Sequence, residues 1–230
     1  MALVDKVGYD LDKIVVPPPL KKPSIFRELI KNVLLIVFFS AFVFIFVNFP
    51  AYYLIGKYRF SPQSVSYQLA DEVPSSTSES PGKTSSAKEV QQFPDNTLMI
   101  ATIGVKAPVS WDVKPDDVMN KLQEGLVHLE GTGHPGEGKN IFVTGHSSNY
   151  WWKKGDYNTV FALLPNLKEG DEIILTYRGK ITRYKVKSLK EVKKKEISDY
   201  LDSKGEQLTL MTCVPVGTNL RRLLVFAEPI

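Results

Sequence analysis

The chain has 230 residues, a formal net charge of +4 and a single cysteine, Cys213. One cysteine excludes an intramolecular disulfide, so the fold must depend on its core alone. The modest positive charge does not require a nucleic-acid partner. Part of it flanks an apolar segment, where basic residues orient a membrane helix.

The first predicted element is a single transmembrane helix at residues 32–56, a run without any charged side chain. A helix rises about 1.5 Å per residue, so this run can cross a hydrocarbon core of about 30 Å. It is longer than the apolar region of a signal peptide and contains Tyr52 and Tyr53 near its end, which favours an uncleaved anchor. A buried core helix is the alternative, but such helices are seldom apolar all round over this length.

Basic residues before the apolar run place residues 1–31 in the cytoplasm, as a short tail, and the C-terminal part outside the cell. Residues 57–95 are rich in Ser, Thr, Pro and Gln. Such a stretch cannot offset its ordering entropy by burial, so a flexible tether is predicted. Residues 96–230 then show alternating apolar runs and have the right size for one compact domain.

Short strands dominate the structure predicted for this domain. A turn at residues 106–108 joins the first two strands, and the spacing of Val118, Leu122 and Leu126 predicts an amphipathic helix. Residues 160–167 suit a short helix or helical turn. Many short strands with one or two helices predict a β-barrel or a closed sandwich. Strands are expected at residues 98–105, 109–113, 141–144, 173–177, 182–186, 208–213 and 223–226.

Three side chains at the ends of apolar runs indicate thiol chemistry on a carbonyl. Cys213 ends one run, His146 ends another, and Arg222 follows the cysteine by nine residues. A thiolate attacks a carbonyl carbon, a histidine manages the proton, and an arginine donates to the oxygen that becomes charged. A small core cysteine is the alternative, although a free thiol outside the cell is an oxidation risk that serine would avoid.

Other residues compete for these roles. His128 is expected near a helix C-terminus, and His134 lies in a glycine-rich loop, so neither follows an apolar strand as His146 does. Arg221 is adjacent to Arg222, and strand alternation sends the two side chains to opposite faces. His146 and Arg222 are therefore the preferred candidates, and Arg221 is expected to be solvated.

Several motifs, in order, resemble the sortase family. The run Thr209-Leu-Met-Thr-Cys-Val-Pro, with Arg222-Leu-Leu-Val after it, is similar to the family's TLxTC and RL(L/I)V segments. The resemblance covers residues 98–228 and implies a mainly β, eight-stranded barrel that catalyses cysteine transpeptidation. It implies that Cys213 is the nucleophile, His146 the acid/base and Arg222 the oxyanion stabiliser. Supporting segments are Gly138-Lys-Asn-Ile-Phe-Val-Thr-Gly-His, Phe161-Ala-Leu-Leu-Pro-Asn-Leu-Lys-Glu-Gly-Asp-Glu-Ile and Ile103-Gly-Val-Lys-Ala-Pro-Val.

The resemblance implies a membrane enzyme with the catalytic domain outside the cell. It would cleave the C-terminal sorting signal of a secreted protein, hold the acyl group on Cys213 and transfer it to an amine of the envelope or a pilin. Ser147 and Ser148 depart from the Arg or Asn that follows the histidine in many relatives. The sequence shows no aromatic lid motif before the barrel and no second membrane segment, which favours surface anchoring over pilus assembly.

Thr212, Val214 and Pro215 are expected to contact the substrate, while Trp151 and Trp152 suit core or rim packing, with a groove-flanking role as the alternative. No cofactor is predicted, because no His, Cys and carboxylate cluster has zinc spacing, although scattered carboxylates leave calcium open. The alternatives are a cysteine hydrolase, an L,D-transpeptidase whose usual cysteine motif is lacking here, and a non-enzymatic β-domain with a dead site.

Overall fold

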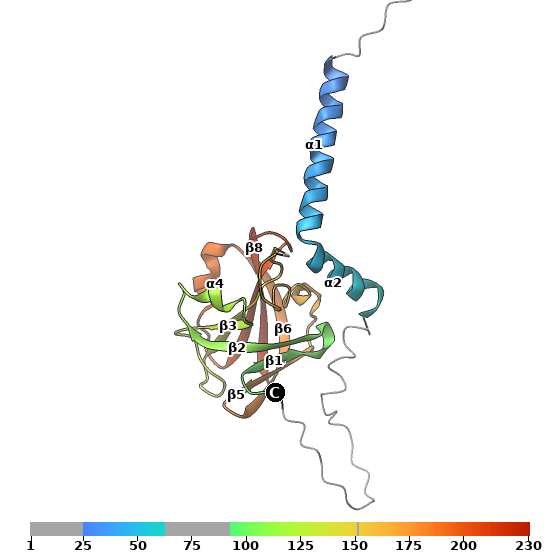
Figure 1. Ribbon diagram of the computed structural model, residues 1–230. Coiled ribbons are helices and arrows are strands. Elements are labelled where there is room, and N and C mark those ends of the chain that lie inside the picture. The colour runs from blue at the N-terminus through green and yellow to red at the C-terminus, as the bar shows by residue number, and fades with distance from the viewer. Residues whose placement is uncertain (1–24, 63–92, 151) are drawn as a thin grey trace, which may run out of the picture. The chain divides into compact units, whose positions relative to one another are not determined.

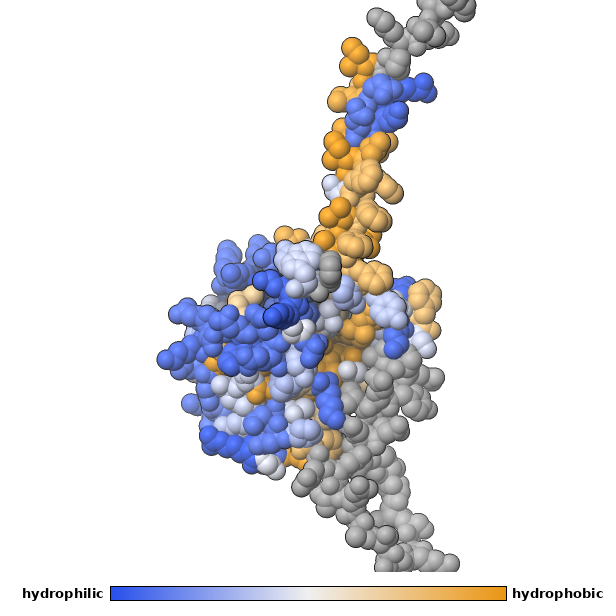
Figure 2. Space-filling model, viewed as in Figure 1, coloured by the Kyte–Doolittle hydropathy of each residue, from blue (hydrophilic) through white to orange (hydrophobic). Residues whose placement is uncertain are grey.

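The computed structural model describes residues 25–62, 93–150 and 152–230, and it divides into two units. The unit that ends at Phe42 holds most of helix α1 (Ile25–Val47), which has no buried residue. Of the described helices, only α1 is long and apolar enough to cross a membrane. Figure 2 shows apolar side chains along most of its surface, with hydrophilic ones towards its N-terminal end. The length and composition of α1 are therefore those of a membrane segment.

The sequence predicts one continuous helix over the charge-free run at residues 32–56, but the structure divides this run between two helices. Helix α1 ends at Val47, and a second helix, α2 (Phe49–Phe60), begins after Asn48. Pro50 lies in the first turn of α2. Proline has no backbone N–H to continue a preceding helix, so the break falls just before it. Three predicted features lie outside the described residues, namely the tail over residues 1–24, the tether over residues 63–92, and Trp151.

The second unit contains a closed β-barrel (Figure 1). Its eight strands follow the order β1-β2-β3-β4-β7-β8-β6-β5. The pairs β2–β3 and β4–β7 are parallel, and the other neighbours are antiparallel. The predicted mainly β barrel with short helices is confirmed. The strands are β1 (Thr97–Ile100), β2 (Val105–Val113), β3 (Leu126–Leu129), β4 (Asn140–Thr144), β5 (Glu172–Tyr177), β6 (Lys180–Val192), β7 (Gln207–Val214) and β8 (Arg221–Pro229).

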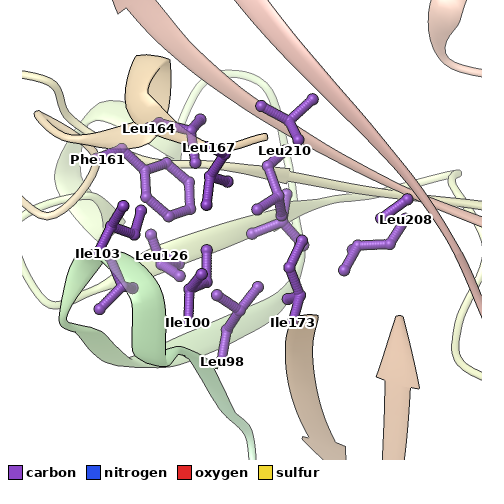
Figure 3. Packing of buried hydrophobic residues seen from close by; sticks show 14 of the residues in the cluster. Leu98, Ile100, Ile103, Leu126, Phe161, Leu164, Leu167, Ile173, Leu208 and Leu210 are labelled. Atoms are coloured by element: carbon purple, nitrogen blue, oxygen red, sulfur yellow. The ribbon is translucent and has the colours of Figure 1, made fainter. Parts of the chain in front are cut away.

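Alternate side chains of the strands fill the barrel. Successive residues of a strand point to opposite faces, so Leu208 and Leu210 of β7 join the main buried cluster, whereas Met211 packs against a separate one. Figure 3 shows Leu210 with Leu126 of β3 and Phe161, which comes from the segment after β4. Complete burial of one such side chain contributes roughly 1.5–3 kcal/mol, so this core supports the fold without a disulfide.

The turn between the first two strands lies earlier than the sequence predicted. The short 3-10 helix η2 (Ala101–Ile103) makes the turn, and Gly104 closes it with φ 65°, a left-handed conformation that glycine adopts easily. Residues 106–108 instead continue β2, where Pro108 lies opposite Thr97. Pro108 is therefore a strand residue and not the predicted turn residue, because a strand tolerates proline where its missing N–H is not needed.

The predicted amphipathic helix is also shorter than expected. Helix α4 covers only Val118–Lys121, and Leu126 begins strand β3. Gly125 allows this change of structure, because a Cβ there would lie 2.4 Å from the carbonyl oxygen of Pro108. His128 is consequently a strand residue rather than a neighbour of a helix C-terminus, and the short strand β3 was missed by the sequence analysis.

Candidate active site

The ends of β4 and β7 bring His146 and Cys213 to one edge of the barrel. The two strands run parallel, with Thr144 opposite Met211. The pairing continues where the Gly145 N–H donates to the Met211 carbonyl at 3.1 Å. Because parallel strands end at the same edge of a sheet, the residues that follow Thr144 lie beside those that follow Met211.

Position 145 requires a glycine for this close approach. A Cβ there would lie 2.5 Å from a ring carbon of Phe161 and 2.6 Å from a methyl carbon of Leu126. The Phe161 N–H donates to the carbonyl oxygen of His146 at 2.9 Å. The backbone of His146 is therefore held by the same aromatic residue that fills the core.

His146 and Cys213 line a common cavity of about 390 Å³. Its wall combines the loop after β4, the loop between β7 and β8, one residue of α4 and the residue between α1 and α2. A cavity with a few polar groups around a free thiol is a candidate binding site. The lining residues are Asn48, Met119, His146, Ser148, Asn149, Tyr150, Cys213, Gly217, Thr218 and Asn219.

The imidazole of His146 is partly buried and has no hydrogen-bond partner among the described residues. Burial lowers its pKa below the ordinary value of 6.5, so the neutral ring predominates at pH 7. A neutral imidazole has both an N–H donor and a lone pair, so it can give or take one proton. Cys213 is a free cysteine on the same cavity.

Arg222 is the direct cross-strand partner of Cys213, and Arg221 is the partner of Val214. Residues opposite each other in an antiparallel pair project to the same face, so Arg222 shares the face of Cys213. Its Nη1 donates to the carbonyls of Asn219, at 2.9 Å, and Arg221, at 3.0 Å. Arg222 does not itself line the cavity. Its guanidinium is hydrogen-bonded to the carbonyl of Asn219, and Asn219 is one of the cavity-lining residues.

Arg221 has a different environment. Its side chain is exposed and its Nη1 lies 3.4 Å from Glu191 Oε2. An exposed ion pair of this kind typically contributes only about 0–1 kcal/mol. The predicted separation of the two arginines onto opposite faces agrees with this register.

The residues expected to contact the substrate lie elsewhere. Thr212 is buried and its hydroxyl donates to the carbonyl of Gly145 at 2.9 Å, while Val214 belongs to the barrel core. Pro215 is exposed, but none of the three lines the cavity. Strand alternation explains the difference, because Thr212 and Val214 flank Cys213 and must point away from its face. Thr212 instead helps to hold the segment that carries His146.

Two features of the cavity wall involve residues that the sequence offered in another role, Ser148 as a departure from relatives and Trp152 as a core, rim or groove-flanking residue. Ser148 Oγ accepts a hydrogen bond from the Gly217 N–H at 2.9 Å and so joins the loop after His146 to the loop after Cys213. Tyr150 stacks on Trp152 with a centroid separation of 4.7 Å and an angle of 7°. In the sequence, the signal that Ser148 lies at the cavity is its position two residues after His146. Met119 has no such signal, because only the fold brings it to the cavity wall.

The two competing histidines do not line this cavity. His128 is fully buried in β3, and its Nε2 lies 2.8 Å from the carbonyl of Gly133. Burial lowers the pKa of His128 as well. His134 contacts Asp112 and Glu137. The structure therefore brings only His146, of the three histidines, to the cavity of Cys213.

Comparison with known proteins agrees with this geometry. A family model described as the sortase domain matches residues 98–230. No curated protein sequence matches the chain significantly. Among solved structures, sortase C-1 from Actinomyces oris is 31% identical with a TM-score of 0.51, over 58% of this chain and 72% of that one.

Two further solved structures are similar. Sortase C2 of pilus island 1 from Group B Streptococcus has 31% identity and a TM-score of 0.51, over 58% of this chain and 72% of that one. Sortase A from Corynebacterium diphtheriae has 29% identity and a TM-score of 0.50, over 60% of this chain and 62% of that one. Since the family model matches more than half of the chain, this protein belongs to the sortase family of cysteine transpeptidases.

Proposed function

We propose that this sortase cleaves a C-terminal sorting signal on secreted proteins and transfers the new acyl end to an amine of the cell envelope. The observation that carries this proposal is the shared cavity of Cys213 and His146, with Arg222 directly opposite the cysteine in the barrel register. A nucleophile, a proton carrier and an oxyanion donor are the parts that acyl transfer requires.

In the first half-reaction, His146 takes the thiol proton of Cys213 while Sγ attacks the carbonyl carbon of the scissile peptide bond. The negative charge that develops on the carbonyl oxygen is stabilised by N–H groups of Arg222, which has five donors and uses only Nη1 in hydrogen bonds to the described residues. The C–N bond then breaks, the leaving amine receives a proton from His146, and a thioester remains on Cys213.

In the second half-reaction, an amine attacks the thioester carbon. His146 takes the proton that this amine loses, the C–S bond breaks, and His146 passes the proton to the departing sulfur, which restores the thiol. The neutral state favoured by the burial of His146 suits this acceptance of a proton. Water in place of the amine would give hydrolysis, which is the alternative function.

Helix α1 supports a location at the membrane, with the barrel on the outer side as the basic flank of the apolar run indicates. The partners are then secreted proteins with a sorting signal and an amine acceptor that are met at the cell surface. The lack of an aromatic lid motif in the sequence before the barrel favours an envelope amine over a pilin side chain.

Mass spectrometry of the full chain in detergent tests this function. A library of sorting-signal peptides is incubated with the enzyme, first alone and then with an envelope-type amine or a pilin peptide. We expect an acylated Cys213 without amine and a ligated peptide with the envelope amine. Cys213→Ala is the matched control and should form neither, because its side chain has no nucleophile.

The possible outcomes separate the rival functions. Released acid in both conditions would show a hydrolase, and preferential ligation to the pilin peptide would show polymerisation instead of anchoring. Turnover by a folded Cys213→Ala variant would contradict the mechanism.

A further inference from the structure

Asp112, His128 and His134 form a compact group of potential metal ligands, and none of them lines the cavity of Cys213. One nitrogen or oxygen atom from each lies within 4.8 Å of the other two. Asp112 comes from β2, His128 from β3 and His134 from the loop before β4. The spacing of these residues in the sequence does not indicate a metal site, because they come together only when β2 and β3 pair.

The surroundings of His128 fix which ring nitrogen carries its proton. Nε2 lies 2.8 Å from the carbonyl of Gly133 and 2.9 Å from Thr132 Oγ1. The Thr132 hydroxyl donates its own proton to the carbonyl of Leu129, so both neighbours of Nε2 act as acceptors. Nε2 must then be the donor, and Nδ1 keeps its lone pair. The Asp112 N–H reaches Nδ1 only at 3.3 Å, a long contact that a metal bond could replace.

His134 is oriented in a comparable way. Its Nδ1 lies 3.2 Å from Glu137 Oε1, and its backbone N–H donates to Oε2 of the same carboxylate at 3.0 Å. Histidines that bind a metal commonly donate their other ring N–H to a carboxylate or a backbone carbonyl. Both histidines of the group have such a partner, Glu137 for His134 and Gly133 for His128.

The remaining nitrogens face the carboxylate of Asp112. Oδ1 lies 3.5 Å from His128 Nδ1 and 2.9 Å from His134 Nε2. A proton on His134 would satisfy one of these contacts, whereas one cation satisfies all three acceptors. We propose that Asp112, His128 and His134 bind a single Zn²⁺ through a carboxylate oxygen, Nδ1 and Nε2, with water as the fourth ligand.

The donor set selects the metal. Zinc binds nitrogen and oxygen at about 2.0–2.2 Å, which puts tetrahedral ligands roughly 3.3–3.5 Å apart. The two carboxylate–nitrogen separations, 2.9 and 3.5 Å, lie within about 0.4 Å of that range, and the ligand atoms all lie within 4.8 Å of one another. Calcium takes about six to eight oxygen ligands, so two imidazoles and one carboxylate do not suit it.

Aromatic side chains pack against the two histidines of the group, while the carboxylate of Asp112 is open to solvent. Trp111 packs against the rings of both histidines, with centroid distances of 4.8 and 5.7 Å, and Tyr177 stacks on His134 at 5.2 Å. The side chain of His128 is 0% exposed, that of His134 18% and that of Asp112 50%. An ion can therefore enter beside Asp112, and once bound it would join β2, β3 and the following loop.

The test uses the untagged full chain in detergent, carrying Cys213→Ala so that the thiol beside His146 cannot bind the metal. The chain is stripped with a chelator and titrated with ZnCl₂ by calorimetry, with CaCl₂ as the matched ion. Co²⁺ serves as a spectroscopic probe, because tetrahedral coordination gives it a strong visible absorption. We expect one Zn²⁺ per chain, a rise in Tm with Zn²⁺ and no rise with Ca²⁺.

Variants in the same background identify the ligands. Asp112→Asn keeps a residue that tolerates the φ of 53° at this position, and with His134→Gln it should abolish stoichiometric binding. Glu137→Gln removes only the outer carboxylate and should weaken binding roughly 10–100-fold. His146→Gln, outside the group, should bind zinc as the parent does. Zinc bound equally by the parent, Asp112→Asn and His134→Gln, or not bound by the parent, would overturn the proposal.

Discussion

Two histidine environments in the barrel unit differ in how many of the imidazole nitrogens have a polar partner within the protein. The ring of His146 has no partner among the described residues and shares a cavity with Cys213. In the second environment, both ring nitrogens of His128 and of His134 lie within 3.5 Å of a polar atom. Both regions contain partly or fully buried imidazoles, so burial alone does not distinguish them.

The difference shows what each environment can do. A ring with free nitrogens beside a cavity can exchange a proton with a substrate that enters, as general acid–base catalysis requires. A ring whose nitrogens are both directed by neighbours keeps one tautomer and one orientation, which suits a fixed role such as ligation. The number of unsatisfied ring nitrogens is therefore more informative here than the pKa direction, which is downward for both His146 and His128.

Removal of His146 should give the largest effect. We expect His146→Ala to lower turnover by about 10²–10⁴-fold, because the reaction loses its general acid and base. His134→Ala, measured in chelator, is the matched control and should retain activity. Peptide ligation kinetics with a Tm check would decide between them. An equal loss in a folded His134→Ala variant would show that the two environments had been assigned wrongly.

Arg222 and Arg221 extend the comparison to the neighbouring strand. Arg222→Lys should lower kcat by about 10²–10³-fold, the usual effect of losing an oxyanion donor, because lysine lacks the planar set of N–H groups. Arg221→Lys should be close to neutral, since its partner Glu191 is also exposed. Kinetics with one peptide substrate test both variants. A silent Arg222→Lys beside an impaired Arg221→Lys would reverse the assignment.

Substitution of Thr212 tests how much its hydrogen bond to Gly145, the residue before His146, contributes to stability. Thr212→Val has nearly the same shape but leaves the buried carbonyl of Gly145 without its donor. We expect a loss of about 1–3 kcal/mol in the free energy of unfolding. Thr212→Ser keeps the hydroxyl and should recover most of that loss in denaturant titrations. If the serine variant is as unstable as the valine variant, packing rather than the hydrogen bond matters here.

The smallest expected effect concerns pH. Burial lowers the folded-state pKa of His146 below the 6.5 of the unfolded chain, so the unfolded state binds the proton first as the pH falls. Stability should therefore be unaffected by this group above that value and decrease below it. Denaturant titrations of the wild type and His146→Gln from pH 8 to pH 5, in chelator, isolate the effect, because His128 is present in both. An identical pH dependence of stability would contradict the assigned burial effect.

Sequence patterns predicted the parts of the fold that depend on strong alternation or clear turns. Strands β4, β5 and β7 were expected within a few residues, and the β5–β6 hairpin was expected from Arg178-Gly179, which have φ of 50° and 72°. Two errors came from residues that allow two structures. Pro108 suits a turn or a strand position, and Leu126 suits a helical spacing or a strand start.

The sequence identified the candidate catalytic residues but not the walls of their cavity. Cys213, His146 and Arg222 belong to local motifs, so a linear pattern carries them. Met119 reaches the cavity only through tertiary packing, and the pairing of β2 with β3 that gathers the metal-ligand group is also tertiary. The inward direction of Thr212 and Val214 follows from alternation around Cys213, a rule that places their side chains away from the face of the cysteine.

The parallel pairing of β4 with β7 also determines when the protein can react. Hydrogen bonds that align His146 with Cys213 join residues 67 positions apart in the chain, as in the bond from the Thr144 hydroxyl to the Met211 carbonyl. Before β4 and β7 pair, the thiol and the imidazole lie on two segments that are distant in the sequence and have no contact that aligns them. A chain that has not yet folded therefore carries both groups without the arrangement that joins them, and only the closed barrel places them together.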